Sequence, residues 1–396
     1  GLAHTVAASG FHVSLLLGVV LALVGSRSPQ LKLGVGLATL LIYLGLTGLQ
    51  PSVLRAALMG SAALIGTASD RQGKPLGALL VAVTVLLLLN PLWIWDIGFQ
   101  LSAAATFGLI VTVPPLMARL TALPITVATL LAVPLAATLW TLPLVLYHFN
   151  TFSVVSVGLS AVTTPLVMVT SLGGIVSGEI ALISPAFGSA VASLLTYPVQ
   201  LLMALAEGSS HLPGSGLAVG QLALWQVLGL YGLMVLAWQH PVGQQRTGLI
   251  ALILGVILAV PLGVQAMAQD RITVLAAGGE LVWVWQDHGE TTLYNSGDRD
   301  TAFYTVQPFL RQAGVNRLVG AIAPALPADY PQGWETLAQD TSIATLYSQS
   351  ESPPIADFKG NYRQLQVGQS TVAGALTVQP LGTDNPIMRL TTSSQS

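Results

Sequence analysis

The sequence predicts a polytopic α-helical membrane protein that ends in a small α/β domain. Of the 396 residues, 53% are hydrophobic and 8% are charged, whereas about 25% of a soluble globular chain is charged. Apolar runs of about 20 residues, the length that crosses a bilayer as a helix, follow one another through most of the chain. Residues 1–268 carry seven basic and four acidic side chains, and residues 269–396 carry seven basic and twelve acidic ones. We therefore expect a transmembrane domain over 1–268, a folded acidic domain over 269–382 and a disordered polar tail over 383–396.

Polar residues stand at the mouth of the first apolar run, where unsatisfied polar groups cost several kcal/mol in a bilayer. His4 and His12 are eight residues apart, which is not the i, i+4 spacing that places two metal ligands on one helix face. Ser9 and Gly10 lie between them as an expected helix break, so we interpret the histidines as hydrogen-bonding groups. Gly1 follows no initiator Met or signal-peptide pattern, and we expect an N-terminal part to be missing.

The apolar runs predict about ten membrane crossings and one re-entrant piece. Glycine, proline, asparagine or charged residues separate the runs. Residues 172–184 are too short to cross, so we expect a half-helix there. The expected crossings are 10–25, 31–49, 52–68, 75–90, 96–113, 124–147, 153–171, 187–206, 217–238 and 248–268.

Basic residues predict the orientation. Five of them fall in alternate loops between the first crossings, and the positive-inside rule makes that side cytoplasmic. The last crossing then delivers the acidic domain to the outer side. These five residues are Arg27, Lys32, Arg71, Lys74 and Arg119.

Prolines interrupt several of the predicted crossings. Such breaks are tolerated where neighbouring helices or a water-filled cavity satisfy the freed backbone groups, which favours a channel or transporter. Prolines are also ordinary in membrane helices, and the sequence leaves both interpretations open. The prolines concerned are Pro134, Pro143, Pro165, Pro198 and Pro261.

Arg55 is the basic residue best placed for a functional role. Pro51 suits the first turn of its helix, Ser52 can help to cap that helix, and Arg55 follows one turn in. Ionisable groups in membrane segments face a bundle interior or an aqueous path by default, so Arg55 can meet a phosphate or pair with an acid. The alternative is that its side chain reaches out to the nearby interface.

Two acidic and two neutral polar residues mark other candidate sites. Asp96 is suited to capping the fifth crossing, whereas Gln100 and Ser102, one turn deeper, can bond across helices or line a path. Glu179 lies on the glycine-rich re-entrant piece, where an ion or proton site and a solvated interfacial carboxylate are equally compatible with the sequence.

Three motifs resemble those of the ComEC-type competence family. Residues 1–13 are similar to its G-L-x-H-x-x-A-x-S-G-x-H-V signature, and residues 51–56 and 96–102 resemble its next two motifs in the same order. The resemblance implies a channel in the bacterial cytoplasmic membrane that passes single-stranded DNA. It also implies partners, an ATP-driven helicase or translocase in the cytoplasm and DNA-receptor proteins, and no cofactor. The matching positions are His4, Ser9, Gly10, His12, Arg55, Asp96, Phe99 and Gln100.

The sequence of the acidic domain predicts short strands over 272–275, 281–285 and 291–294 and a helix over 307–313 that ends at Gly314. This order resembles the start of a metallo-β-lactamase-like domain, in which two metals need an S-H-x-x-x-D-H cluster. The corresponding stretch has Ala325 and Tyr330 at the histidine positions and keeps only Asp329. We therefore expect a degenerate domain with a structural role, no metal and no catalytic residue.

Two other functions compete with the channel. A secondary transporter of a small solute would use Asp96 and Glu179 as proton sites. A membrane-anchored nuclease is disfavoured by the missing metal ligands. The chain has no cysteine, which excludes disulfides, thiolate metal sites and a cysteine nucleophile.

Overall fold

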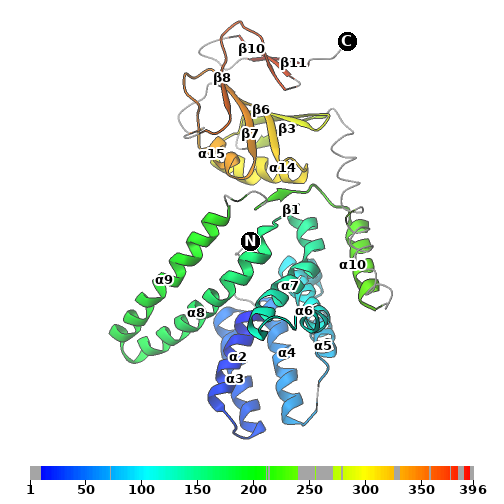
Figure 1. The fold of residues 1–396 in the computed structure, drawn as a ribbon, viewed down its shortest axis with the longest axis vertical. Coiled ribbons are helices and arrows are strands. Elements are labelled where there is room, and N and C mark those ends of the chain that lie inside the picture. Colours follow the sequence, from blue (N-terminus) through cyan, green and yellow to red (C-terminus); the bar gives the residue numbers. More distant parts are fainter. Residues whose placement is uncertain are drawn as a thin grey trace. The chain divides into compact units, whose positions relative to one another are not determined.

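The structure is a computed structural model that describes residues 10–71, 73–210, 212, 215–239, 255, 271–277, 280–324, 331–355, 358–374, 376–381 and 388–392. It forms two compact units (Figure 1). The first contains Gly1–Leu144 and Ser153–Ser215, and the second contains Val145–Phe152 and Gly216–Ser396. The division falls inside helix α7 (Ile125–Phe149) rather than at the change of charge near residue 269.

Apolar helices account for most of the first unit. Six of the described helices are long and apolar enough to cross a membrane, and three are shorter. These nine coincide with nine of the expected crossings, and the tenth, 248–268, lies outside the described residues apart from Gly255. The long helices are α3 (Pro29–Thr47), α4 (Pro51–Ala68), α6 (Ile97–Arg119), α7, α8 (Val155–Ile183) and α9 (Pro185–Ser210), and the shorter ones are α2 (Gly10–Val24), α5 (Pro75–Leu89) and α10 (Leu224–Gln239).

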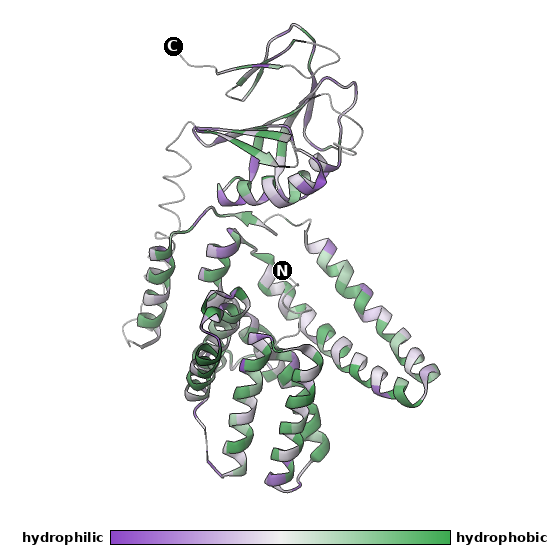
Figure 2. Cartoon of the chain, turned by 180° about the vertical axis from the view of Figure 1, so that it is seen from behind, coloured by the Kyte–Doolittle hydropathy of each residue, from purple (hydrophilic) through white to green (hydrophobic). Residues whose placement is uncertain are grey.

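Local sequence explains where these helices begin. Pro29, Pro51 and Pro75 stand at the first helical position, where a missing N–H costs nothing. Ser28 also accepts a hydrogen bond from the Leu31 amide at 3.4 Å. In Figure 2 hydrophobic residues, drawn in green, recur along the helices, as expected for helices that lipid or other helices surround.

The half-helix expected over 172–184 was wrong. Those residues continue α8 without a break up to Ile183. A Cβ on Gly173 would lie 2.4 Å from Leu195 Cδ2, and one on Gly188 would lie 2.4 Å from the Cβ of Ala181. The glycines therefore permit close packing of α8 on α9 rather than a helix break.

Prolines inside the helices do not end them. The helix α6 continues through Pro114 and Pro115 to Arg119, beyond the expected end at residue 113. The other expected prolines also lie within helices, Pro134 and Pro143 in α7 and Pro165 in α8. Pro261 lies outside the described residues.

The second unit contains a six-stranded sheet in the order β3-β4-β5-β6-β7-β8 and a three-stranded antiparallel sheet in the order β11-β10-β9. The pairs β3–β4 and β4–β5 are antiparallel, and the pairs from β5 to β8 are parallel. The strands are β3 (Arg271–Ala277), β4 (Glu280–Asp287), β5 (Glu290–Tyr294), β6 (Arg317–Ala323), β7 (Ser342–Ser348), β8 (Asn361–Gln364), β9 (Thr371–Ala373), β10 (Leu376–Pro380) and β11 (Met388–Thr392).

Helices cover one face of the larger sheet, and the smaller sheet covers part of the other (Figure 1). Val284 and Leu293 of the sheet pack with Leu310 and Leu337 of the helices. On the opposite face, Ile322 packs in a cluster with residues of β9 and β10. The helices are α13 (Arg299–Thr301), η2 (Ala302–Val306), α14 (Gln307–Gln312) and α15 (Pro331–Asp340).

The strands expected from the sequence of this domain are confirmed as β3, β4 and β5. The expected helix starts earlier, at Arg299, because Asp298 caps it by accepting a hydrogen bond from the Thr301 amide at 2.8 Å. It ends before Gly314, whose φ is 72°. The prediction of a disordered tail was wrong for 388–392, which pair with β10 because Met388 and Leu390 pack on the smaller sheet.

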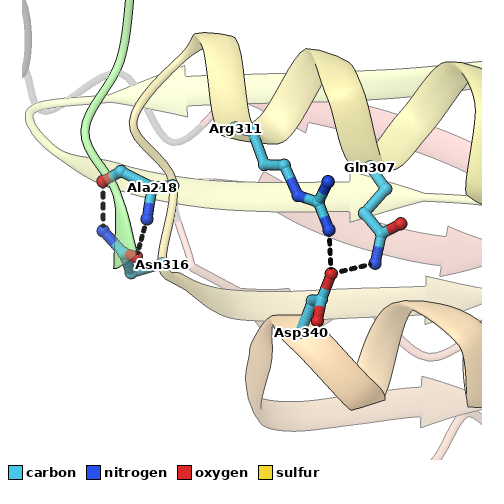
Figure 3. Close-up of polar contacts among 5 residues, drawn as sticks. All are labelled: Ala218, Gln307, Arg311, Asn316 and Asp340. Carbon is cyan, nitrogen blue, oxygen red and sulfur yellow. Dashed lines mark hydrogen bonds and ion pairs between the residues drawn. The ribbon is translucent and has the colours of Figure 1, made fainter. Parts of the chain in front are cut away.

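A short ribbon ties two helix connections to the α/β domain. The strands β1 (Thr151–Phe152) and β2 (Leu217–Ala218) pair antiparallel. Asn316 holds Ala218 by two bonds, accepting from its amide at 2.7 Å and donating to its carbonyl at 2.8 Å (Figure 3). The Gln221 amide also donates to the Gln312 carbonyl at 2.9 Å. These contacts explain why the connections belong to the second unit.

Candidate functional site

A buried arginine, Arg55, is the centre of the candidate site in the first unit. It lies one turn into α4, and its exposed fraction is 6%. Val53 and Ala57 of the same helix are equally buried and pack in the cluster that contains Val13 and Leu40. The apolar surroundings therefore enclose the start of α4, and the guanidinium has to find its partners inside the bundle.

Hydroxyl groups from α6 supply those partners. The Arg55 Nε donates to Ser102 Oγ at 2.9 Å, and its Nη1 donates to Thr106 Oγ1 and, at 3.6 Å, to Met59 Sδ. Ser102 and Thr106 are four residues apart on one helix face, and Thr106 in turn donates to the Ser102 carbonyl at 2.9 Å. The site is thus a cation surrounded by neutral acceptors.

The other end of the guanidinium faces α2. A Cβ on Gly10 would lie 3.0 Å from Arg55 Nη2, so a glycine lets the two helices approach closely here. A guanidinium has five N–H donors, and the acceptors among the described residues account for three of them. The two donors on Nη2 point toward the start of α2.

No carboxylate lies within ion-pair distance of Arg55 among the residues that the structure describes. An uncompensated buried charge is costly, by several kcal/mol after relaxation. Within a membrane segment such a group is by default functional. Neutral hydroxyls and an unpaired positive charge make this a place suited to an anion.

The motif of residues 1–13 contributes Gly10 to this site. His12 lies two residues after Gly10 and is partly buried. Its ring stands edge-to-face with that of Phe11, with 5.6 Å between the ring centroids. His4 and Ser9 lie outside the described residues. The helix break expected at Ser9 and Gly10 stays a prediction, because the described residues begin at Gly10, the first residue of α2.

In the motif of residues 96–102, Asp96 caps α6 and Ser102 contacts Arg55. Asp96 is exposed and accepts a hydrogen bond from the Phe99 amide at 2.6 Å, so it caps α6 as expected. Phe99 is 5% exposed and packs inside, while Gln100 Nε2 donates to the Ile94 carbonyl at 2.7 Å. Ser102 alone of this motif joins Arg55.

Two other predicted residues lie apart from the Arg55 cluster. Ser52 is the second residue of α4, and the expectation that it helps to cap this helix was wrong, because Gln50 is the N-cap and no side chain caps it. Glu179 is exposed on α8. It forms none of the hydrogen bonds that hold the guanidinium.

Sequence reasoning missed Thr106 and Met59. Each lies one turn beyond a predicted residue, Thr106 after Ser102 and Met59 after Arg55. This i, i+4 spacing was the available signal.

The α/β domain does not fit the two-metal site of a metallo-β-lactamase-like fold. Among its described residues no group of three or more His, Asp or Glu side chains could hold an ion. His288 is in the β4–β5 turn beside Asp287. A Cβ on Gly333 would lie 2.1 Å from the Gly297 carbonyl oxygen, so α15 packs directly onto the turn after β5. The segment 325–330, with Asp329, lies outside the described residues.

The fold and the Arg55 site together define a class: a polytopic membrane protein with a basic group enclosed by its helices and an α/β domain at its end. The sequence profile of a family described as "Competence protein" matches residues 1–243. The chain belongs to this competence protein family, which confirms the resemblance of its three motifs. The match ends before the α/β domain begins.

A curated relative agrees with this assignment. ComE operon protein 3 of Bacillus subtilis (strain 168) is 36% identical over 191 residues, which is 48% of this chain and 24% of that protein. The chain therefore matches only about a quarter of that relative's length. No solved structure matches the chain, so the likeness of the α/β domain to a metallo-β-lactamase stays a prediction.

Proposed function

We propose that the chain acts in DNA uptake during natural transformation, as part of a channel that passes single-stranded DNA into the cytoplasm. The observation that carries this proposal is the buried Arg55 guanidinium, which has no carboxylate partner among the described residues. Arginine matches the geometry of phosphate with two parallel donors. Among the described residues no acceptor meets the two Nη2 donors, which lie beside Gly10, and we infer that these donors meet a passing phosphate.

Sparse charge suits a path for a polyanion that has to keep moving. Each phosphate contact strengthens binding and makes it dependent on salt, and the membrane part carries only seven basic residues. Contacts along such a path are transient. The driving force then comes from a partner, an ATP-driven helicase or translocase in the cytoplasm, and DNA-receptor proteins deliver the strand from outside.

The loop charges support an orientation in the cytoplasmic membrane. Arg27 lies between α2 and α3, Arg71 and Lys74 lie between α4 and α5, and Arg119 ends α6. These connections alternate along the chain, so the positive-inside rule places them in the cytoplasm. With about ten crossings, the α/β domain lies on the outer side. Its role is structural rather than enzymatic, because the metal ligands are lacking.

Genetic complementation tests the channel. A deletion strain should lose transformation but keep DNA bound at the cell surface, and the wild-type chain should restore it. Arg55→Ala and His12→Ala should not restore it, whereas Arg119→Ala, an exposed arginine at the end of α6, should. Normal transformation in the deletion strain would contradict the proposal.

A secondary transporter of a small solute is the other candidate, with Asp96 and Glu179 as proton sites. Asp96 is engaged as the α6 cap, which leaves this candidate with one of its two carboxylates. Transformation that persists without the chain, together with solute uptake that requires Glu179, would favour the transporter.

A further inference from the structure

The α/β domain carries an open hollow at the edge where its parallel strands begin. The hollow has a volume of about 460 Å³ and lies at the starts of β6, β7 and β8. Four polar side chains line it, those of Arg317, Ser342, Lys359 and Asn361. Neither the uptake path nor the lost metal site uses this edge.

A glycine fixes one wall of the hollow. A Cβ on Gly360 would lie 2.5 Å from the Ile343 carbonyl oxygen and 2.9 Å from that of Ala344. Only glycine therefore lets the chain before β8 approach the start of β7 so closely. This packing holds Lys359 at the same hollow as Arg317, although 42 residues separate them in the sequence.

The charge of the hollow is opposite to that of the domain. The region from residue 269 carries seven basic and twelve acidic residues, yet two basic and no acidic side chains line the hollow. Within the described residues, neither Arg317 nor Lys359 has a carboxylate at ion-pair distance. Asp357 lies outside those residues. Arg317 and Lys359 are both exposed at this hollow, and two basic side chains without a carboxylate partner among the described residues suit a single anionic group.

Chain connectivity places the hollow near the ends of apolar helices. Asn316, which precedes Arg317, holds Ala218 of the ribbon and accepts a hydrogen bond from the Ser342 amide at 3.2 Å. The ribbon starts two residues after α7 ends and finishes six residues before α10 begins. Because two residues of extended chain span at most about 7 Å, the start of the ribbon lies within about that distance of the end of α7. The anion met here is therefore one found at a membrane surface.

We propose that this hollow binds the phosphate of an anionic lipid headgroup and so anchors the α/β domain to the membrane surface. Anionic headgroups attract basic side chains near a bilayer. A DNA strand fits less well, because the rest of this acidic domain would repel a long polyanion. The proposal is independent of the uptake function.

Hydrogen exchange of the full chain in lipid nanodiscs tests the anchor. We expect phosphatidylcholine discs containing phosphatidylglycerol to slow exchange at the starts of β6, β7 and β8, relative to phosphatidylcholine alone. Each basic side chain near an anionic surface contributes about fivefold in affinity, which makes about 25-fold for two, so Arg317→Gln with Lys359→Gln should remove most of the protection that phosphatidylglycerol gives. The double variant Arg299→Gln with Arg389→Gln, which changes two exposed arginines elsewhere in the domain, should behave as the wild type.

Several outcomes would overturn the anchor. They are equal exchange in the two kinds of disc, equal loss of protection in both double variants, and the same protection in phosphatidylcholine discs with soluble glycerol phosphate or with a single-stranded oligonucleotide. Unchanged exchange in the β4–β5 hairpin shows that each variant has kept its fold.

Discussion

At the scale of single residues, the proposed function depends on the buried Arg55. This residue is 6% exposed, and among the described residues hydroxyl groups rather than a carboxylate are the oxygen partners of its guanidinium. A structural arginine in such a position would be expected to have an acidic partner. Replacing the Arg55 guanidinium by an apolar group should therefore impair DNA uptake without lowering the stability of the chain.

Arg55→Met removes the buried charge and retains a flexible apolar side chain. Thr106 keeps its own bond to the Ser102 carbonyl, so no hydroxyl network collapses. We expect the thermal midpoint of the detergent-solubilised chain to be unchanged or higher, because an apolar replacement for a buried ion is neutral or stabilising. A midpoint lowered by many degrees would instead assign Arg55 a structural role.

Thr106→Val is the complementary change. It leaves the buried guanidinium without one acceptor, and an unsatisfied buried donor costs about 1–3 kcal/mol. We expect this variant to unfold at a lower denaturant concentration than the wild type. Thr84→Val, at an exposed threonine of α5, serves as its control and should change the midpoint little.

At the scale of helices and strands, glycines decide how closely neighbours pack. The shortness of residues 172–184 predicted a half-helix on this glycine-rich stretch, but these residues continue α8 up to Ile183, and Leu195 of α9 occupies the space that a side chain at Gly173 would need. A sequence shows where glycines are, and it does not show whether they face a turn or a neighbouring helix. The missed Thr106 has the same origin, because a threonine often bonds only to its own helix.

Gly108→Ala tests this packing between α6 and α7. A Cβ on Gly108 would lie 2.6 Å from Trp140 Cδ1 and 2.8 Å from Trp140 Cβ. Trp140 is also held by its bond to Thr112 Oγ1 at 2.8 Å, so the indole cannot move away freely. We expect a loss of about 1–3 kcal/mol in unfolding free energy. Gly34→Ala, which meets nothing within 4 Å, should cost much less.

Asn316→Ala tests the link between the ribbon and the α/β domain. It removes both hydrogen bonds to Ala218. Amide exchange of residues 217–221 should become about tenfold faster, which corresponds to about 1.4 kcal/mol. Gln366→Ala, at an exposed amide elsewhere in the domain, should leave that exchange unchanged. Equal exchange in the Asn316 variant would show that other contacts hold the ribbon.

At the scale of the whole molecule, composition predicted the architecture and tertiary packing decided the details. The lengths of the apolar runs located nine of the described helices, whereas the division into two compact units falls inside α7 and not at the change of charge. Long-range pairing was beyond the sequence. Nothing local joins Asn316 to Ala218, because 98 positions separate them in the sequence. The site was predicted as far as Arg55 and Ser102, whose contact depends on how α4 meets α6.

The histidine content of the α/β domain leads to a prediction for the full chain. Without a second and third histidine in this domain, a two-metal hydrolytic site cannot assemble. We expect no metal-dependent cleavage when the purified chain is incubated with DNA and Mn²⁺ or Zn²⁺. Cleavage that a chelator abolishes, and that Asp329→Ala also abolishes, would contradict this expectation.

The account rests on Arg55 acting in the passage of DNA, and entry of labelled DNA tests that role most directly. Cells that carry the Arg55→Met chain should bind labelled DNA at the surface as well as wild-type cells do, with an equal amount of chain in the membrane. We predict that the fraction of this DNA that becomes resistant to external nuclease falls at least tenfold, and that Arg119→Met leaves it unchanged. Wild-type levels of nuclease-resistant DNA in the Arg55→Met cells would contradict the account.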